Sequence, residues 1–231
     1  PVNRWVKNRN NSISTIIEYI GAYDNYGVPD YLEDEGDNFE QGFYNELTNS
    51  LPERQRLTDS HPEYLADEVQ TNIVVTDSAE VTVSFIHEGA GYRNVLGYYT
   101  YILGSPPENI NDIDSLYIVF PNASFPGSGG NLEAGSKVNL GVFPDSTVIG
   151  WFLVANGWTG NEVGNGNHTL YSNTNLNPEN NADYQQHNVL LLDDSRELLV
   201  LGFEDLIRPG GDGDFNDAIF AVRVNPFENI Q

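Results

Sequence analysis

The sequence predicts an all-β protein, an antiparallel β-sandwich of jelly-roll-like arrangement. From about Thr71 onward apolar and polar residues alternate, as over 81–85, and a period of two is typical of a half-buried strand. Gly, Pro, Asn and Asp separate the runs, and many short strands with such turns are typical of sandwiches and barrels. The further predicted strands are 92–103, 115–120, 137–143, 147–155, 188–192, 197–203 and 218–224.

The N-terminal part has a different pattern. Four apolar side chains recur every four residues and would lie along one helical face: Phe39, Phe43, Leu47 and Leu51. This spacing predicts a short helix over 38–51, which Pro52 ends. The pattern over 12–20 fits a short helix or a strand equally well.

We therefore divide the chain at residue 65. Residues 1–65 are expected to form an N-terminal segment whose short helix packs on the core, and residues 66–231 the β-sandwich domain. Within that domain, residues 161–184 are rich in Asn and Gly and are expected to form a surface loop.

The composition excludes several partners. Lys and Arg number 10 against 34 Asp and Glu, a net charge of −24. Nucleic acid needs a basic footprint, and an anionic membrane surface would repel this chain. No apolar run is long enough for a membrane span, so we expect no membrane insertion. Without cysteine, thiolate sites and disulfides are excluded. Methionine is also absent, and we expect a processed form or an excised piece.

Acidic residues gather near the C-terminus in a pattern that suits a cation. The run 209–217 reads Pro-Gly-Gly-Asp-Gly-Asp-Phe-Asn-Asp, and Glu204 and Asp205 precede it. Ca²⁺ takes six to eight oxygen ligands in flexible geometry, and glycines let backbone carbonyls join the carboxylates. We expect ligands among Asp212, Asp214, Asn216 and Asp217. The alternative is an acidic hairpin turn, because Asp-Gly is a favoured turn pair.

These residues resemble a known family. Phe203-Glu204-Asp205, followed by Gly211-Asp212-Gly213-Asp214-Phe215-Asn216-Asp217, is similar to the signature of the bacterial family called domain of unknown function 4114, and LruC-type secreted proteins carry a similar pattern. The stretches 61–65, 85–92, 96–99 and 150–153 are also similar, so that the resemblance spans about 20–225. It implies metal ligands at Glu204, Asp205, Asp212, Asp214 and Asp217, and no enzymatic activity. Similar domains in large calcium-dependent adhesins bind peptides through calcium.

Other acidic residues are weaker candidates for metal ligands. Asp24 and Asp30 lie around a glycine in an acidic stretch, which fits either a second calcium site or a plain turn. Glu88 precedes the flexible Gly89-Ala90-Gly91 and is expected to supply a further oxygen.

The sequence predicts no catalytic centre and no zinc site. The four histidines lack ligand spacing, and His87 and His187 are expected to be structural. Tyr98, Tyr99 and Trp158 are candidates for a peptide- or glycan-binding surface, although aromatic residues in strands more often pack in a core.

These features favour a secreted or cell-surface, non-enzymatic module that uses Ca²⁺ for stability and for adhesion to a peptide or glycan. The first alternative is a structural subunit of a self-assembling filament or surface layer, in which copies of the chain are the partners. The second is a calcium-dependent hydrolase or lyase, which would need an acid/base pair in a cleft.

Overall fold

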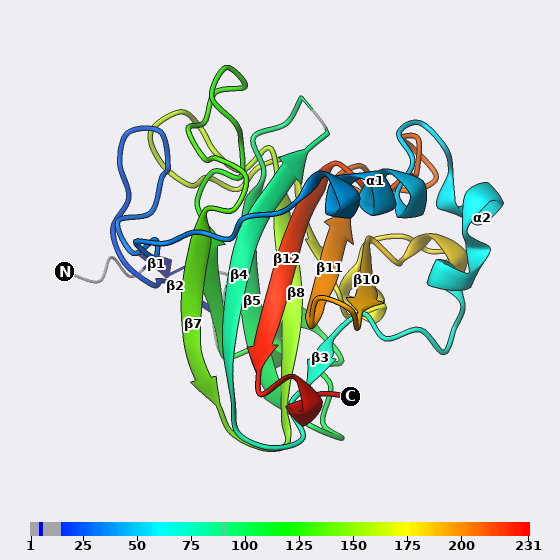
Figure 1. The fold of residues 1–231 in the computed structure, drawn as a ribbon. Coiled ribbons are helices and arrows are strands. Elements are labelled where there is room, and N and C mark those ends of the chain that lie inside the picture. Colours follow the sequence, from blue (N-terminus) through cyan, green and yellow to red (C-terminus); the bar gives the residue numbers. More distant parts are fainter. Residues whose placement is uncertain (1–4, 7–14, 90) are drawn as a thin grey trace.

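Two β-sheets lie face to face and form a β-sandwich (Figure 1). The computed structural model describes residues 5–6, 15–89 and 91–231. In the first sheet the strand order is β1-β2-β6-β5-β8-β3, and β9 also pairs with β8. Its strands are β1 (Trp5–Val6), β2 (Ile16–Tyr19), β3 (Ile73–Val74), β5 (Val95–Ile102), β6 (Ser115–Phe120), β8 (Thr147–Ala155) and β9 (His168–Tyr171).

The second sheet has the strand order β10-β11-β12-β4-β7, and all of its pairs are antiparallel. Its strands are β4 (Ala79–Glu88), β7 (Lys137–Phe143), β10 (Asn188–Asp193), β11 (Leu198–Phe203) and β12 (Ala218–Asn225). The predicted β-sandwich is confirmed, with one parallel pair, β2 with β6, in the first sheet. The jelly-roll-like arrangement stays a prediction.

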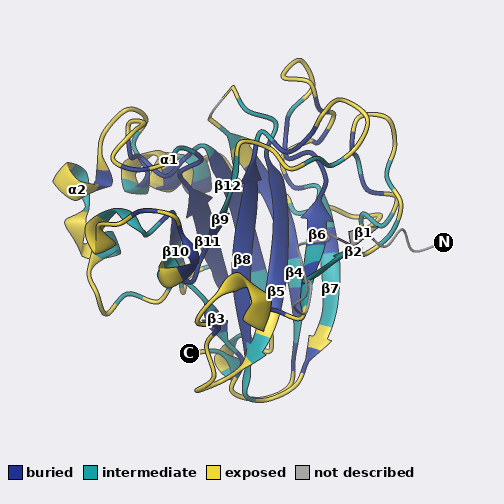
Figure 2. Cartoon of the chain, turned by 180° about the vertical axis from the view of Figure 1, so that it is seen from behind, coloured by how far each residue is buried: buried dark blue, intermediate teal, exposed yellow. Residues whose placement is uncertain are grey.

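Most central strands are buried on both faces, as Figure 2 shows. Alternate residues of β12 illustrate the reason. Phe220 and Val222 pack between the two sheets, whereas Ile219 and Ala221 point to the outer face of the second sheet. Two covered faces explain why such strands read as almost continuous apolar runs.

The helix α1 (Gln41–Ser50) covers the outer face of the second sheet. Its Phe43 and Leu47 pack with Val200 of β11 and Ile219 of β12. The predicted helix is therefore confirmed, although it begins at Gln41 rather than residue 38. It ends where Leu51 N donates to Leu47 O (2.8 Å), directly before Pro52.

Residues 168–171 differ from the surface loop that the Asn- and Gly-rich composition predicted. They form β9, which pairs with β8 and buries Leu170 and Tyr171. The polar neighbours are accommodated because their side chains hydrogen-bond to nearby backbone groups. Asn177, for example, donates through Nδ2 to Tyr171 O (2.7 Å) and accepts at Oδ1 from Tyr171 N (2.7 Å).

The remaining helices are short. No helix in the described ranges is both long and apolar enough to cross a membrane. For residues 12–20 the ambiguity is resolved as strand over Ile16–Tyr19, whereas residues 12–14 lie outside the described ranges. The short helices are α2 (Leu57–Ser60) and the single 3₁₀ turns Pro62–Leu65, Ile110–Asp112, Thr174–Leu176, Ala182–Tyr184 and Phe227–Asn229.

Candidate metal centre

The acidic residues lie in the loop that joins β11 to β12 at one end of the second sheet. Because the two strands are antiparallel neighbours, Phe203 faces Ala218 across the pair, and Asp217 N donates to Phe203 O (3.1 Å). Residues 204–217 therefore leave and re-enter the sheet at one point. This return brings acids that are several residues apart in the sequence into one small volume.

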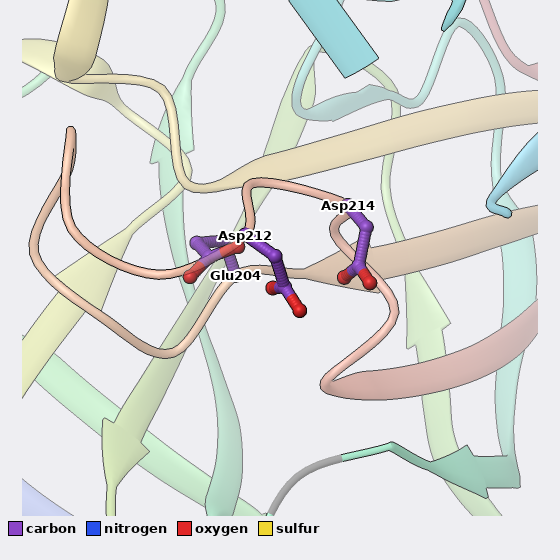
Figure 3. A group of neighbouring side chains, drawn as sticks. All are labelled: Glu204, Asp212 and Asp214. Carbon is purple, nitrogen blue, oxygen red and sulfur yellow. The ribbon is translucent and has the colours of Figure 1, made fainter. Parts of the chain in front are cut away.

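Three carboxylates meet in this loop. Glu204, Asp212 and Asp214 each place an oxygen so that all three atoms lie within 4.8 Å of one another (Figure 3). Glu204 is 0% exposed and Asp214 1%, whereas Asp212 is exposed. Among the described residues this is the single group of three or more potential metal-binding side chains that meets this spacing. We call it the acidic triad.

The backbone between the acids adopts unusual conformations. Gly211, Gly213 and Phe215 have φ angles of 72°, 67° and 59°, in the left-handed region. Glycine takes this region without steric cost. At residue 211 glycine is also required by space, because a β-carbon there would overlap Oε1 of Glu204. The two glycines thus allow the loop to curl tightly around the carboxylates.

A segment distant in the sequence holds the loop from one side. After α1 the chain passes the loop and contacts it three times. Arg54 N donates to Asp214 Oδ2 (2.7 Å), Leu57 N to Gly213 O (2.9 Å) and Arg56 Nη2 to Gly211 O (3.0 Å). These contacts join the N-terminal part of the chain to the acidic loop, and no pattern in the sequence predicted them.

Glu204 is the least satisfied group of the site. It is fully buried, and neither of its carboxylate oxygens has a hydrogen-bond partner among the described residues. Burial raises its pKa to about 8, and the negative charges of Asp212, Asp205 and Asp214 act in the same direction. Burying an ionised carboxylate without a partner is costly, so this position favours either a proton or a cation.

A second acidic pair lies beside the triad. Asp205 N donates to Asp217 Oδ2 (2.8 Å), and Asn94 Nδ2 donates to Asp205 Oδ2 (2.8 Å). Burial raises the pKa of Asp217 to about 9, assisted by the charges of Asp205 and Glu204. Burial also raises the pKa of Asp205 and of Asp214. Four carboxylates with a raised pKa, those of Glu204, Asp205, Asp214 and Asp217, are therefore gathered at or next to one site.

Three buried residues, Glu179, His187 and Arg208, support the loop, and the sequence analysis predicted this contact for none of them. Glu179 accepts at Oε1 from Arg208 N (3.2 Å) and lies 2.7 Å from His187 Nε2. The other ring nitrogen of His187 is 3.2 Å from the carbonyl oxygen of Glu204 and donates to it, because a carbonyl only accepts. The guanidinium of Arg208 lies over the ring of Phe215, 5.1 Å from its centroid.

Little in the sequence could have identified these three residues. Glu179 and His187 stand in a polar stretch without ligand spacing. Only Arg208 offers a hint, as one of ten Lys and Arg residues in a very acidic chain, placed directly before the acidic run.

Two further predicted ligands, Asn216 and Glu88, do not belong to the triad. Asn216 is buried, donates through its backbone N to Asp214 Oδ1 (3.2 Å) and through Nδ2 to Leu51 O (3.4 Å). Glu88 accepts at Oε2 from Phe125 N (2.8 Å). Both residues anchor neighbouring loops, and their role as metal ligands stays a prediction.

The second predicted calcium site has the geometry of a turn. Asp24 accepts at Oδ1 from Tyr26 N (2.8 Å) and from Val28 N (2.9 Å), an arrangement in which an Asp side chain closes a turn. Asp30 is exposed. These two carboxylates belong to no group of three among the described residues, so calcium binding there stays a prediction without support from the geometry.

The aromatic residues proposed to bind a ligand lie in the interior. Tyr98 is 7% exposed, Tyr99 0% and Trp158 1%. Tyr98 stacks on Tyr117 with centroids 5.0 Å apart, and the hydroxyl of Tyr99 donates to Asn173 Oδ1 (2.5 Å). Their burial explains why they are aromatic, and it gives a ligand-binding role no support.

The histidines are dispersed over the described part of the chain. His61 contacts Glu63, His168 contacts the carbonyl of Asp205, and His187 contacts Glu179. His87 is exposed at the end of β4, and partial desolvation by neighbouring groups lowers the pKa of its ring. None of them belongs to a metal-ligating group among the residues described.

The chemistry of the site follows from its donors. They are three carboxylates, of which those of Glu204 and Asp214 are buried, and that of Glu204 has no hydrogen-bond partner among the described residues. Such a buried acidic triad can hold a metal ion, and oxygen donors suit a hard cation.

Comparison with known proteins supports the resemblance noted in the sequence. Residues 143–225 match the model of a family described as "Domain of unknown function (DUF4114)". The match runs from the end of β7 through β12 and contains all five acids of the cluster, but it is narrower than the span of 20–225 that we predicted. No curated protein and no solved structure matches the chain. The relation to LruC-type proteins and to adhesin modules stays a prediction. Over residues 143–225, therefore, the chain is similar to the DUF4114 family.

Proposed function

We propose that this protein is an extracellular calcium-binding module that holds a partner at a cell surface and does not convert it. The observation that carries the proposal is the carboxylate of Glu204, fully buried, without a hydrogen-bond partner among the described residues, and adjacent to Asp212 and Asp214. A bound cation would satisfy this carboxylate and neutralise the repulsion among the acids.

Calcium fits the donors best among the common cations. The three residues offer only oxygen atoms, which disfavours the softer transition metals. Ca²⁺ accepts six to eight oxygens at flexible angles, whereas Mg²⁺ demands near-ideal octahedral geometry. The curled backbone at Gly211 and Gly213 would supply carbonyl oxygens in addition to the carboxylates.

The nearby positive charges are already engaged and do not replace a cation. Arg56 donates to the carbonyl of Gly211, and Arg208 donates to the carbonyl of Gln186 (2.9 Å) while it lies over Phe215. Neither guanidinium forms an ion pair with the acidic triad. The excess of negative charge at the loop therefore calls for a bound ion.

The site is open on one side, which would allow a partner to reach the metal. Asp212 is exposed, whereas Glu204 and Asp214 are buried. A calcium ion bound by these three carboxylates could take its last oxygen ligand from a peptide carboxylate, a sugar hydroxyl or a neighbouring copy of the chain. Such binding would depend on calcium and would resist moderate salt better than a surface ion pair.

An extracellular setting suits this use of calcium. Calcium is abundant outside cells and scarce inside them. With a dissociation constant a thousandfold below the free calcium concentration, binding would stabilise the fold by about 4 kcal/mol. Without cysteine the chain has no disulfide to provide such a constraint.

Isothermal titration calorimetry with calcium, together with thermal unfolding in calcium and in chelator, tests the proposal. We expect stoichiometric binding and a melting temperature that is higher in calcium by about 10 °C, given a stabilisation of about 4 kcal/mol. Magnesium should bind more weakly. Asp214→Asn should weaken calcium binding, whereas Asp114→Asn, at an exposed acid outside the loop, should leave it unchanged. Identical melting curves with calcium and with chelator would reject the metal site.

A second set of measurements addresses the partner. Binding of peptides and glycans, and self-association, should each be measured with calcium and with chelator. Turnover of any of these ligands would contradict the non-enzymatic part of the proposal.

A further inference from the structure

The outer face of the first sheet carries a cavity of about 710 Å³. It lies over β2, β6, β8 and β9, and residues 108–111 and 163–165 also line it. This volume is typical of sites for small molecules. The cavity shares no residue with the acidic triad.

The floor of the cavity is apolar. Four side chains line it: Leu116 and Ile118 of β6 and Phe152 and Val154 of β8. All four are buried in one apolar cluster. Such a floor packs against the C–H groups of a ligand rather than against its charges.

Hydrogen bonds fix the walls before any ligand arrives. Thr15 Oγ1 donates to Ile110 O (2.9 Å), and Asn175 Nδ2 donates to Pro107 O (3.0 Å). On the opposite edge Gly164 N donates to Gly157 O (2.7 Å). A preformed cavity of this kind loses little conformational freedom when a ligand binds.

Polar groups at the cavity remain available. Tyr171 is only 4% exposed, and its hydroxyl makes no hydrogen bond to any described residue. The side-chain amides of Asn111 and Asn165 also line the cavity and have no hydrogen-bond partner in the described ranges. Amides and a hydroxyl offer both donors and acceptors, which neutral hydroxyl groups match.

Charge narrows the class of ligand. Among the described residues, no Lys, Arg or His lines the cavity, and Glu108 is the one carboxylate. In a chain with a net charge of −24 an anionic ligand would be repelled. A purely apolar ligand would cover the hydroxyl of Tyr171 without offering it a hydrogen-bond partner, which costs affinity.

We propose that this cavity binds a neutral saccharide, with the apolar face of the sugar on the floor and its hydroxyls on Tyr171 and the amides of the rim. This binding does not require calcium, because the cavity and the acidic triad are separate. It therefore goes beyond the proposed calcium-dependent function and can fail or succeed independently.

The test uses saturation-transfer NMR and calorimetry on the full chain with glucose, galactose and N-acetylglucosamine as neutral probes. Glucuronate serves as the anionic comparison and indole as the apolar one. Tyr171→Phe removes only the hydroxyl, and Thr169→Phe places a ring in the cavity. Tyr26→Phe is the matched control, because this tyrosine is 57% exposed and lies outside the cavity.

We expect at least one neutral sugar to bind in calcium and in chelator alike. Tyr171→Phe should weaken it about 5- to 10-fold, the value of one hydrogen bond. Thr169→Phe should abolish it with the fold retained by circular dichroism, and Tyr26→Phe should have no effect. Binding of indole or glucuronate in preference to every neutral sugar would overturn the proposal. So would absence of sugar binding, or sugar binding that chelator abolishes and Thr169→Phe does not.

Discussion

Gly211 lies directly against Oε1 of Glu204, with no room for a β-carbon between them. The glycine also has a φ of 72°, so its identity is required twice, by conformation and by space. The closeness of this backbone to a buried carboxylate is what shapes the proposed cation site.

Gly211→Ala should weaken calcium binding at least about tenfold, because the methyl group must displace Glu204. The left-handed conformation alone costs a non-glycine residue about 1 kcal/mol. Gly127→Ala separates the two effects, since Gly127 has a φ of 94° and no atom within 4 Å of the added carbon. Calorimetry on both variants should show lost affinity only at Gly211. Equal affinities would show that Glu204 is not a ligand.

Glu204→Gln should have opposite effects with and without calcium. In chelator at about pH 9 the wild-type carboxylate is ionised, buried and unpaired, so replacing it by a neutral amide should raise the melting temperature. In saturating calcium the same change should lower it, because a ligand is lost. A fall of the melting temperature in both solutions would assign Glu204 a purely structural role.

Stability in chelator should decrease as the pH rises from about 4.5 to about 9. The folded pKa of Glu204 is about 8 and that of Asp217 about 9, whereas unfolded Glu and Asp titrate near 4. Across this window the folded chain binds more protons than the unfolded chain, so deprotonation favours unfolding. Below pH 4 both states are protonated and the effect vanishes.

In saturating calcium this pH dependence should disappear or reverse, because calcium binds the deprotonated form. Melting temperatures at a series of pH values, in chelator and in calcium, measure both slopes. A stability that rises with pH in chelator would contradict the assignment of raised pKa values.

Glu179→Ala should destabilise the fold by about 2–4 kcal/mol, because it leaves Nε2 of buried His187 without its hydrogen-bond partner and the backbone N of Arg208 without its acceptor. Glu179→Gln retains an acceptor and should cost less. If these residues position Glu204 through its carbonyl, both variants should also weaken calcium binding in proportion. If a destabilised variant keeps its calcium affinity, Glu179 and His187 stabilise the fold without positioning Glu204.

Strand positions were predictable from the sequence because packing on two faces leaves a strong apolar signal. The predicted ranges 115–120, 137–143 and 147–155 coincide with β6, β7 and β8. The parallel pairing of β2 with β6 was not predictable, since it joins Ile16 to Ser115, and periodicity carries no information about such distant partners.

The candidate site likewise contains residues that the sequence predicted and residues that it did not. Asp212 and Asp214 were predicted because acids and glycines alternate locally, and Glu204 because the family resemblance implied it. Arg54, Glu179 and His187 were not, because each reaches the loop through the tertiary fold and a single contact has no local signature. Strand β9 was missed because its four residues stand among Asn and Gly, and because Asn177 supports the strand through hydrogen bonds to its backbone, which leave no apolar alternation in the sequence.

The hydrogen bond from Arg54 to Asp214 joins positions 160 residues apart. Closing so long a loop is entropically costly, and contacts of this kind form late when a chain folds. The complete cation site would then be absent from the transition state, and calcium would bind only after the main barrier has been crossed. An ion that acts at that stage leaves the refolding rate almost unchanged and slows unfolding instead. In the proposed extracellular setting, calcium would lengthen the lifetime of the folded state by lowering its unfolding rate.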